Sequence, residues 1–237
     1  MKITIIIPTL NEAGHLRRLL PYLKENGEDL VAEIIVSDGN SDDETIRIAQ
    51  NLGVKVVEGK ARCRAKQMNT AAYSSQADIF YFVHADTIPP TTFASDIMSS
   101  IRKGYKIGGY RFRFDSSKPM LRFNSWMTRF NIEAFRGGDQ SLFITREMWE
   151  KLGGFDEKFV VMEEYDLLRK AKKFGRFCLI PKDVLVSARK YDENSWLRVN
   201  FANTVAMFQF RMGVDPLNIK ETYSRFLRHK IISYRNI

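Results

Sequence analysis

The sequence predicts one α/β domain with a mainly parallel sheet flanked by helices and a C-terminal helical extension. In the first hundred residues, short runs of β-branched residues alternate with amphipathic stretches of helical length, which is the pattern of βαβ units. The 237 residues, of which 44% are hydrophobic, can fill a sizeable core. Because no internal repeat, low-complexity tract or linker divides the chain, one domain is the simplest arrangement.

The first hundred residues supply four segments that are apolar enough for strands covered on both faces. These predicted strands are Ile3–Ile7, Glu33–Val36, Val54–Glu58 and Ile79–Val83. Helices are predicted between and after them, at Glu12–Asn26, Ser41–Leu52, Arg64–Ser75 and from Pro90 to about Lys103. Ser41 and Glu44 have the spacing of a capping box, so we expect the second helix to begin at Ser41.

The pattern changes after Lys103, where aromatic and basic residues become frequent. Strict alternation over Tyr110–Phe114 predicts a half-exposed strand. Further strands are predicted at Gln140–Thr145, Phe177–Ile180 and Val184–Ala188, and helices at Glu163–Phe174 and Ser195–Arg211. We expect Gly213 and Pro216 to end the last of these helices.

The cysteine count and the hydropathy exclude several classes of protein. Cys63 and Cys178 are too few for a disulfide scaffold and cannot form a zinc site alone, so a cytoplasmic chain with reduced thiols is expected. No apolar stretch approaches the ~20 residues that span a bilayer. Pro8 interrupts the first apolar run before it could act as a signal peptide. Any membrane contact would therefore be peripheral.

The net charge of +9 is unevenly distributed along the chain. Residues 1–100 have ten basic against thirteen acidic residues, whereas residues 101–136 have nine against two and residues 196–237 have seven against two. Such basic segments suit a polyanion, an anionic lipid surface or a phosphorylated small substrate.

Polar and acidic residues follow three of the predicted strands. The segments are Thr9-Leu10-Asn11-Glu12, Ser37-Asp38-Gly39-Asn40-Ser41-Asp42-Asp43 and His84-Ala85-Asp86-Thr87. Each alone is explained by turn and helix-cap chemistry. Because the carboxyl ends of parallel strands meet at one edge, where α/β sheets bind ligands, the three together predict a binding cleft.

Two short segments suggest how such a cleft would hold a nucleotide diphosphate. His84-Ala85-Asp86 resembles the acidic signature with which nucleotide-sugar enzymes hold Mg²⁺ or Mn²⁺ through hard oxygen ligands. Four cations lie in or just before the third helix, at Lys60, Arg62, Arg64 and Lys66. They form either a solvated helix face or a diphosphate site in which Arg62 or Lys66 reaches the ligand, helped by the helix N-terminus.

In this order, the motifs resemble those of the family-2 glycosyltransferases with the GT-A fold, over nearly the whole chain. Besides the strand-end segments, the resemblance rests on the runs Lys66–Ala72, Gly137-Gly138-Asp139-Gln140, Leu152-Gly153-Gly154-Phe155 and Met162–Leu167. The chain looks closest to a bacterial subgroup with His-Ala-Asp-Thr in the metal segment. The resemblance implies a nucleotide-binding half at 1–100, an acceptor half at 101–190 and an extension, 191–237, packed on the same domain.

The resemblance also implies roles for individual residues. Thr9 and Glu12 would line the nucleoside pocket, Asp38 would hydrogen-bond the base or ribose, and Asp86 would be the metal ligand. The donor site would be completed by Pro8, Asn11, Arg62, Lys66, Asn69, His84 and Ala85. Gly138, Asp139 and Gln140 would border the donor sugar and the acceptor.

The catalytic base is expected in the pair Glu163-Glu164. In many relatives this pair reads Glu-Asp with the Asp as base, so Glu164 occupies the position of the base, and Glu163 remains the alternative. A structural explanation also exists, since Glu163, Glu164 and Asp166 are the acidic first turn of a helix. His84 stands where many members have an acidic residue, and it is expected to be an outer contact, a sugar contact or a packed histidine and not a ligand.

The expected function is an inverting, metal-dependent transfer of a sugar from a nucleotide-diphospho-sugar, taken to be a UDP-sugar, to a lipid-linked or otherwise anionic acceptor. This reaction would serve cell-envelope polysaccharide or glycolipid synthesis, with the protein at the inner face of the plasma membrane. The basic, aromatic block 101–136 is core packing or an acceptor platform. The alternatives are a sugar-nucleotide nucleotidyltransferase, a basic binding protein and an inactive pseudoenzyme. A nucleic-acid partner is not expected, because no recognition motif is present.

Overall fold

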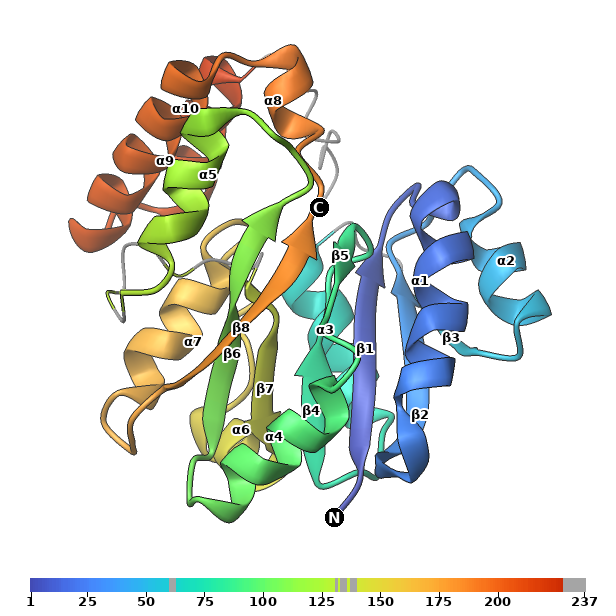
Figure 1. Ribbon diagram of the computed structural model, residues 1–237. Coiled ribbons are helices and arrows are strands. Elements are labelled where there is room, and N and C mark those ends of the chain that lie inside the picture. The colour runs from blue at the N-terminus through green and yellow to red at the C-terminus, as the bar shows by residue number, and fades with distance from the viewer. Residues whose placement is uncertain (60–62, 131, 133–135, 137–139, 228–237) are drawn as a thin grey trace.

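The computed structural model describes the chain except residues 60–62, 131, 133–135, 137–139 and 228–237. Its described part contains one eight-stranded sheet with the order β3-β2-β1-β4-β7-β6-β8-β5 (Figure 1). The strands are β1 (Ile3–Thr9), β2 (Val31–Asp38), β3 (Lys55–Glu58), β4 (Ile79–Phe82), β5 (Thr87–Ile88), β6 (Ile107–Phe114), β7 (Leu142–Thr145) and β8 (Cys178–Val186).

The strand directions bring most strand ends to one edge of the sheet. β3, β2, β1 and β4 are mutually parallel, β7 is antiparallel to both β4 and β6, and β6 is parallel to β8. The carboxyl ends of β1, β2, β3, β4, β6 and β8 therefore lie at the same edge, together with the start of β7. We call this the carboxyl edge and the opposite one the amino edge. The prediction of a mainly parallel sheet is confirmed.

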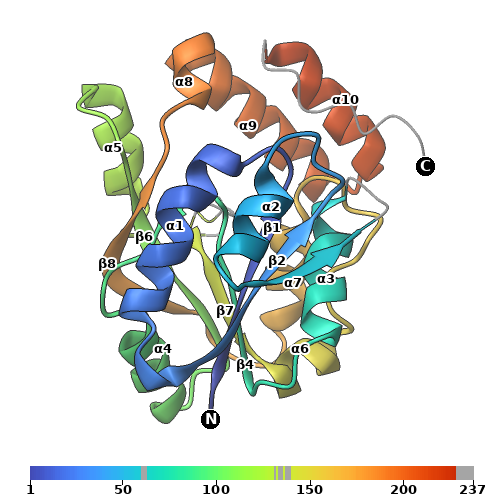
Figure 2. The same ribbon diagram turned by 90° about the vertical axis from the view of Figure 1, so that its right-hand side faces the viewer.

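Helices cover both faces of the sheet (Figure 2). One face carries α1 (Ala13–Asn26), α2 (Thr45–Asn51) and α4 (Phe93–Arg102), and the other carries α3 (Arg64–Tyr73), α6 (Arg146–Leu152) and α7 (Glu163–Ala171). Ile5 and Ile7 of β1 pack toward α1, whereas Ile6 packs toward α3, as the two-residue period of a strand requires. Each fully buried leucine of α1 contributes about 2 kcal/mol, so packing holds the helix on the sheet.

The C-terminal part of the chain lies at the end of the molecule toward which β1, β6 and β8 point (Figure 1). It contains α8 (Lys190–Glu193), α9 (Trp196–Arg211) and α10 (Pro216–Phe226). The side chains of α9 and α10 share an apolar cluster with Phe159 and Tyr165, which joins them to the body of the domain. α5 (Pro119–Met127) lies beside α9, because Asn124 Oδ1 accepts a hydrogen bond of 3.2 Å from Trp196 Nε1.

The predicted capping box at the start of α2 is wrong. The helix begins at Thr45, and no side chain of its N-cap residue Glu44 caps it, since Glu44 pairs with Arg17 and Arg47. The backbone N–H of Thr45 donates instead to Asp43 Oδ1 over 2.9 Å. Ser41 is recruited by Asp38, whose carboxylate accepts from both its hydroxyl and its backbone N–H. A partner from β2 therefore displaces the local cap.

Other boundaries also differ from the prediction. The two strands expected at Phe177–Ile180 and Val184–Ala188 are one strand, β8, whose pairing with β6 shifts register between Tyr110 and Arg111. Pro181 lies in this irregularity. Because proline in a sequence argues against a continuous strand, the prediction divided β8 into two strands there. The short helices α6 and α8, the helix α10 and the two-residue strand β5 were not predicted. No helix in the described part of the chain is long and apolar enough to cross a bilayer.

Candidate active site at the carboxyl edge

Backbone strain among the described residues is concentrated at the carboxyl edge. The non-glycine residues with positive φ there are Asn11 (57°), Asn40 (69°), Ser141 (52°) and Met162 (66°), which follow β1, follow β2, precede β7 and precede α7. A left-handed backbone is costly for serine and methionine, and it persists only where the surroundings impose it. Such strain is typical of ligand sites, so this edge is the candidate site.

The ends of β1 and β2 are joined by the carboxylate of Asp38, which is fully buried. Asp38 Oδ1 accepts from Thr9 Oγ1 at 2.9 Å and from Ser41 Oγ at 2.6 Å, and Oδ2 accepts from Ser41 N at 2.7 Å. In this structure Asp38 therefore supports the loop after β2. Its predicted hydrogen bond to a base or ribose stays a prediction.

Residues of α3 hold this part of the site from the other face of the sheet. Gln67 Nε2 donates to the carbonyl oxygens of Thr9 and Ser37, at 2.7 and 2.8 Å, and so fixes the separation of β1 and β2. Gly39 accommodates this contact, because a Cβ there would lie 2.9 Å from Gln67 Nε2. Sequence reasoning did not single out Gln67.

Asn69 faces away from Gln67, as residues two apart on a helix do. Its amide is buried and bonded to the backbone of Phe155 in both directions at 2.9 Å, and also to Glu157 Oε1 at 3.1 Å. These hydrogen bonds tie α3 to the loop after α6. The donor-binding function predicted for Asn69 thus receives no support from the geometry.

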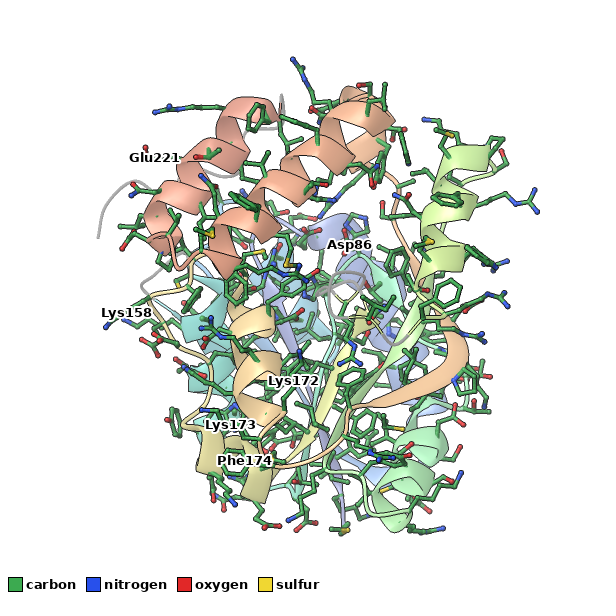
Figure 3. The ribbon with its side chains drawn as sticks, turned by 90° about the vertical axis from the view of Figure 1, so that its left-hand side faces the viewer. Asp86, Lys158, Lys172, Lys173, Phe174 and Glu221 are labelled. Carbon is green, nitrogen blue, oxygen red and sulfur yellow. The ribbon has the colours of Figure 1, made fainter. Side chains whose placement is uncertain are left out.

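The end of β4 presents Asp86 to two other elements. Arg189, which follows β8, forms two hydrogen bonds with Glu12, of 2.7 and 3.1 Å, and its Nη2 lies 3.2 Å from Asp86 Oδ2. His15 Nδ1 lies 2.7 Å from the same Glu12 carboxylate. Burial of Arg189 works against its charge, but the hydrogen bond to Glu12 and the charges of Asp86 and Glu12 outweigh it and raise the pKa of the guanidinium. In Figure 3, Asp86 lies at the end of the sheet that faces the C-terminal helices.

The three carboxylates at the start of α7 divide into two groups. Asp166 pairs with Arg169 and Lys170 of its own helix, at 2.8 and 2.7 Å, so its position is explained by local charge pairing. Glu163 and Glu164 instead face other elements. Glu163 Oε1 lies 3.3 Å from Arg64 Nη1, and Glu164 Oε1 lies 3.4 Å from His84 Nε2. The structure thus separates the acid pair of the site from the helix-stabilising acid.

Burial makes the Glu163-Glu164 pair unusual. Both side chains are buried, although carboxylates are rarely so unless they are paired or functional. Met162 immediately before them adopts the left-handed conformation as the N-cap of α7. After this turn, Glu164 contacts His84 beyond the end of β4, and Glu163 contacts Arg64 at the start of α3.

Asp86 was predicted to bind the divalent cation. Its carboxylate supplies the hard oxygen that Mg²⁺ and Mn²⁺ prefer. Within the described ranges, no three His, Cys, Asp or Glu residues form a group able to hold a metal ion. A cation at Asp86 would therefore need most of its ligands from a bound molecule and from water, as the nucleotide diphosphate of a donor would supply.

The remaining predicted site residues differ in accessibility. Pro8 and Ala85 are buried, so that only their backbone could meet a ligand, whereas Asn11 and Lys66 are exposed. Asn11 Oδ1 accepts from Asp42 N at 2.8 Å and so holds the loop after β2. Gln140 is buried two residues before β7. Arg62, Gly138 and Asp139 lie outside the described residues.

Sequence reasoning overlooked Arg64 and Arg189. Arg64 was counted among the cations of the third helix, but Arg62 and Lys66 were preferred. Arg189 follows a strand predicted to end at Ala188, so the rule that ligands bind beyond strand ends could have identified it. Its partner Glu12 is far away in the sequence, and nothing local indicated the pairing.

Comparisons with known proteins agree with this geometry. The chain matches the family described as Glycosyl transferase family 2 over residues 4–155. It is 30% identical over 112 residues to a dolichol-phosphate mannosyltransferase of Pyrococcus furiosus, covering 45% of this chain and 32% of that protein. It is 31% identical over 87 residues to the succinoglycan biosynthesis protein ExoA of Rhizobium meliloti, covering 35% and 26%. The matches thus span about a third of these relatives or less.

Solved structures of glycosyltransferases share the fold. A mannosyltransferase from Pyrobaculum calidifontis in complex with GDP-Man and Mn²⁺ superposes with a TM-score of 0.70 at 20% identity, covering 95% of this chain and 69% of that one. Glucosyl-3-phosphoglycerate synthase from Mycobacterium tuberculosis, with Mn²⁺ and UDP, gives 0.65 at 17% identity, covering 90% and 80%. The fold is therefore that of the GT-A enzymes, as expected. Because the family match covers more than half of the sequence, the chain belongs to glycosyl transferase family 2.

Proposed function

We propose that this protein transfers a sugar from a nucleotide-diphospho-sugar to an acceptor hydroxyl, with inversion, in a single displacement. The observation that carries the proposal is the buried pair Glu163-Glu164, which contacts His84 after the end of β4 and Arg64 at the start of α3. An inverting transfer requires one general base near the anomeric carbon and no covalent nucleophile. Residues 1–100 would then form the nucleotide-binding half and residues 101–190 the acceptor half.

The donor is proposed from the site and from the relatives. Solved relatives contain GDP-Man, UDP or UDP-GlcNAc, two of them with Mn²⁺. A UDP-sugar is the first donor to test and GDP-mannose the second. Asp86 would hold the divalent cation, which stabilises the charge that develops on the departing diphosphate. The loop after β2 and the exposed Asn11 and Lys66 would border the nucleotide.

In the proposed mechanism, Glu164 accepts the proton of the acceptor hydroxyl at its carboxylate. His84, 3.4 Å from Glu164 Oε1, restricts the orientation of this carboxylate. Arg64 neutralises Glu163, so that two adjacent buried acids do not both remain uncompensated. The same cation near the start of α3 would also attract the diphosphate, since the helix N-terminus favours anions.

The test is donor turnover combined with donor binding. Titration of UDP and GDP with and without Mn²⁺ should show metal-dependent binding that Asp86→Ala removes. Release of the nucleotide from the matching sugar nucleotide should require acceptor. Metal-independent binding unaffected by Asp86→Ala would exclude the metal assignment. Tight binding without turnover, across a panel of lipid-linked and anionic acceptors, would favour the inactive family member instead.

We also propose that the acceptor is presented at an anionic membrane surface, which the C-terminal helices would contact. Leu197, Phe201, Phe208 and Met212 recur at i, i+4, i+11 and i+15 and form one exposed stripe on α9, with 56–72% of each residue accessible. The opposite side of α9 is buried on the domain through Val199, Ala202, Ala206 and Phe210. A helix apolar on both sides is ordinarily buried on both, so the stripe calls for a partner.

The charged residues around this stripe favour an anionic lipid surface as its partner. No acidic residue lies between Trp196 and Val214, whereas Arg198 and Arg211 are both exposed. α5 beside α9 adds exposed Phe123 and Trp126, whose rings stack at 6.1 Å, together with the exposed Arg122. Exposed aromatic rings beside arginines match the interface of an anionic bilayer. α9 also lies at the same end of the molecule as the carboxyl edge (Figure 1).

Vesicle flotation tests the contact. The protein should float with vesicles of phosphatidylcholine and phosphatidylglycerol and much less with phosphatidylcholine alone. Replacing Phe201 and Phe208 by serine together should weaken binding about tenfold or more, because each buried ring contributes about 1.5–3 kcal/mol. Phe174→Ser is the matched control, since Phe174 is exposed at the opposite end (Figure 3). Equal binding of the double variant, or self-association abolished by it, would contradict the proposal.

A further inference from the structure

Arg189 connects two carboxylates that come from different strand ends. Its Nη1 and Nη2 donate to Glu12 Oε2 and Oε1, at 3.1 and 2.7 Å, and Nη2 is also 3.2 Å from Asp86 Oδ2. Two parallel N–H···O bonds make the contact with Glu12 the stronger one, and the contact with Asp86 is single and longer. The guanidinium therefore has a firm partner in Glu12 and a weaker one in Asp86.

The backbone sets this arrangement. Thr87 of β5 pairs with Val186 of β8, and Ser187 N donates to the carbonyl oxygen of Asp86 over 3.2 Å. The segment carrying Arg189 is thereby held beside the end of β4. Glu12 is held in turn, because its backbone N–H donates to Thr45 Oγ1 over 2.9 Å and its carboxylate contacts His15. Arg189 is thus directed to Asp86 by fixed elements and is not a freely moving surface side chain.

The position of Arg189 conflicts with a cation bound at Asp86 alone. A divalent cation lies about 2.0–2.6 Å from its carboxylate oxygens. The guanidinium, 3.2 Å from one of the two oxygens of Asp86, would then be close to a second, doubly charged cation. This repulsion falls only if Arg189 moves away or if additional negative charge enters the site.

We propose that Arg189 is a positioning residue that occupies Asp86 in the free protein and makes cation binding dependent on the nucleotide diphosphate. This inference rests on the proposed function. The diphosphate adds the negative charge that both cations need, and Arg189 can stay on Glu12 while it releases Asp86. Cation and nucleotide then bind with positive coupling, which by linkage is reciprocal. Without nucleotide, Asp86 remains neutralised and the cation binds weakly.

Electron paramagnetic resonance of Mn²⁺ measures this coupling without turnover. In the native protein, Mn²⁺ alone should bind weakly, and saturating UDP or GDP should tighten Mn²⁺ binding at least tenfold. Arg189→Gln should tighten the binding of Mn²⁺ alone about tenfold and reduce the nucleotide effect correspondingly. Unchanged Mn²⁺ affinity in Arg189→Gln, with nucleotide coupling intact, would overturn the inference.

Lys106→Gln is the matched control for general electrostatics. It removes one positive charge from a side chain of similar exposure, 46% against 43%, but Lys106 pairs with Glu147 at the amino edge, away from Asp86. It should change the affinity for Mn²⁺ alone by less than threefold. An effect as large as that of Arg189→Gln would show that net charge, and not the contact with Asp86, controls the cation.

Glu12→Gln keeps the inference testable if Arg189→Gln does not fold. Loss of the Glu12 carboxylate leaves Asp86 as the charged partner of Arg189, so binding of Mn²⁺ alone should weaken further. Tighter binding would contradict the inference. Failure of the proposed function is distinguishable, because the native protein would then bind neither UDP nor GDP, or would bind Mn²⁺ independently of Asp86.

Discussion

The two edges of the sheet treat their charged residues differently. At the amino edge, Asp78 and Glu147 pair with the N-terminal amine and Lys106, and both carboxylates are well exposed. At the carboxyl edge, Asp38, Glu163 and Glu164 are buried and paired across elements. Exposed ion pairs lose little hydration and add little to the free energy of unfolding. Buried carboxylates lose their hydration and therefore need hydrogen bonds or a cation to offset that loss. The comparison shows that the buried charge is concentrated at the carboxyl edge, where we propose that binding and chemistry occur.

The backbone repeats this contrast. The turns that lead into β3 and β6 use Gly53 and Gly104 at positive φ, where glycine carries no steric cost. The carboxyl edge places Ser141 and Met162 in the same region of φ. The turns at the amino edge therefore have an unstrained backbone, whereas the carboxyl edge has non-glycine residues in a strained backbone conformation.

The largest expected effect comes from the acid pair of α7. Glu164→Gln should lower kcat by about 10²- to 10⁴-fold, the usual contribution of a general base, with little change in melting temperature. Glu163→Gln should affect kcat less, because Glu163 already pairs with Arg64. At the amino edge, Glu147→Gln should leave the steady-state rate unchanged. A variant Glu164→Gln with near-native kcat, or a larger loss in Glu163→Gln, would move the base to Glu163.

A smaller effect is expected from the carboxylate that supports the loops of the carboxyl edge. Asp43 accepts from the backbone N–H groups of Thr45 and Ala13 at the starts of α2 and α1. Asp43→Ala should lower the free energy of unfolding by about 1 kcal/mol at pH 7, as loss of a helix cap does. Urea denaturation measures this difference.

The pH dependence of this difference follows from the pKa of Asp43. Burial opposes its charge, but hydrogen bonds from Thr45 and Ala13 outweigh burial and lower the pKa. A carboxylate whose pKa is lowered by folding stabilises the fold. This stabilisation is complete above the unfolded pKa of about 3.9, and it is lost as the pH falls through the folded pKa. The gap between native and Asp43→Ala proteins should therefore close below about pH 3.9. A gap that persists there would mean that packing, and not charge, is responsible.

The smallest effect is expected at the amino edge. The hydrogen bond from Lys106 and then its charge lower the pKa of Glu147, but the carboxylate is fully exposed. Lys106→Gln should leave the melting temperature unchanged within error and insensitive to added salt, as for most surface pairs. A clear destabilisation, measured by calorimetry, would break the contrast between the two edges.

Much of the fold could be predicted because its signals are local. The apolar segments of β1, β2 and β4 and the leucines of α1 follow the strand and helix periods, and their packing agrees with them. The predictions failed where a distant partner competes with a local signal. Ser41 donates a hydrogen bond to Asp38 and does not cap α2 as predicted. β8 continues past Pro181 as one strand because it pairs with β6 on both sides of that residue.

The sequence by itself determined the family, the parallel strands and the chemical types at their ends. Only the tertiary structure decided how those residues are used, because the partners are far apart in the chain. Glu164 meets His84 across 80 positions, Glu163 meets Arg64 across 99, and Arg189 meets Glu12 across 177. Asp166, two residues after Glu164, pairs with Arg169 of its own helix. Residue type follows from the sequence, but which carboxylate pairs with another element and which pairs within its own helix depends on contacts that exist only after folding.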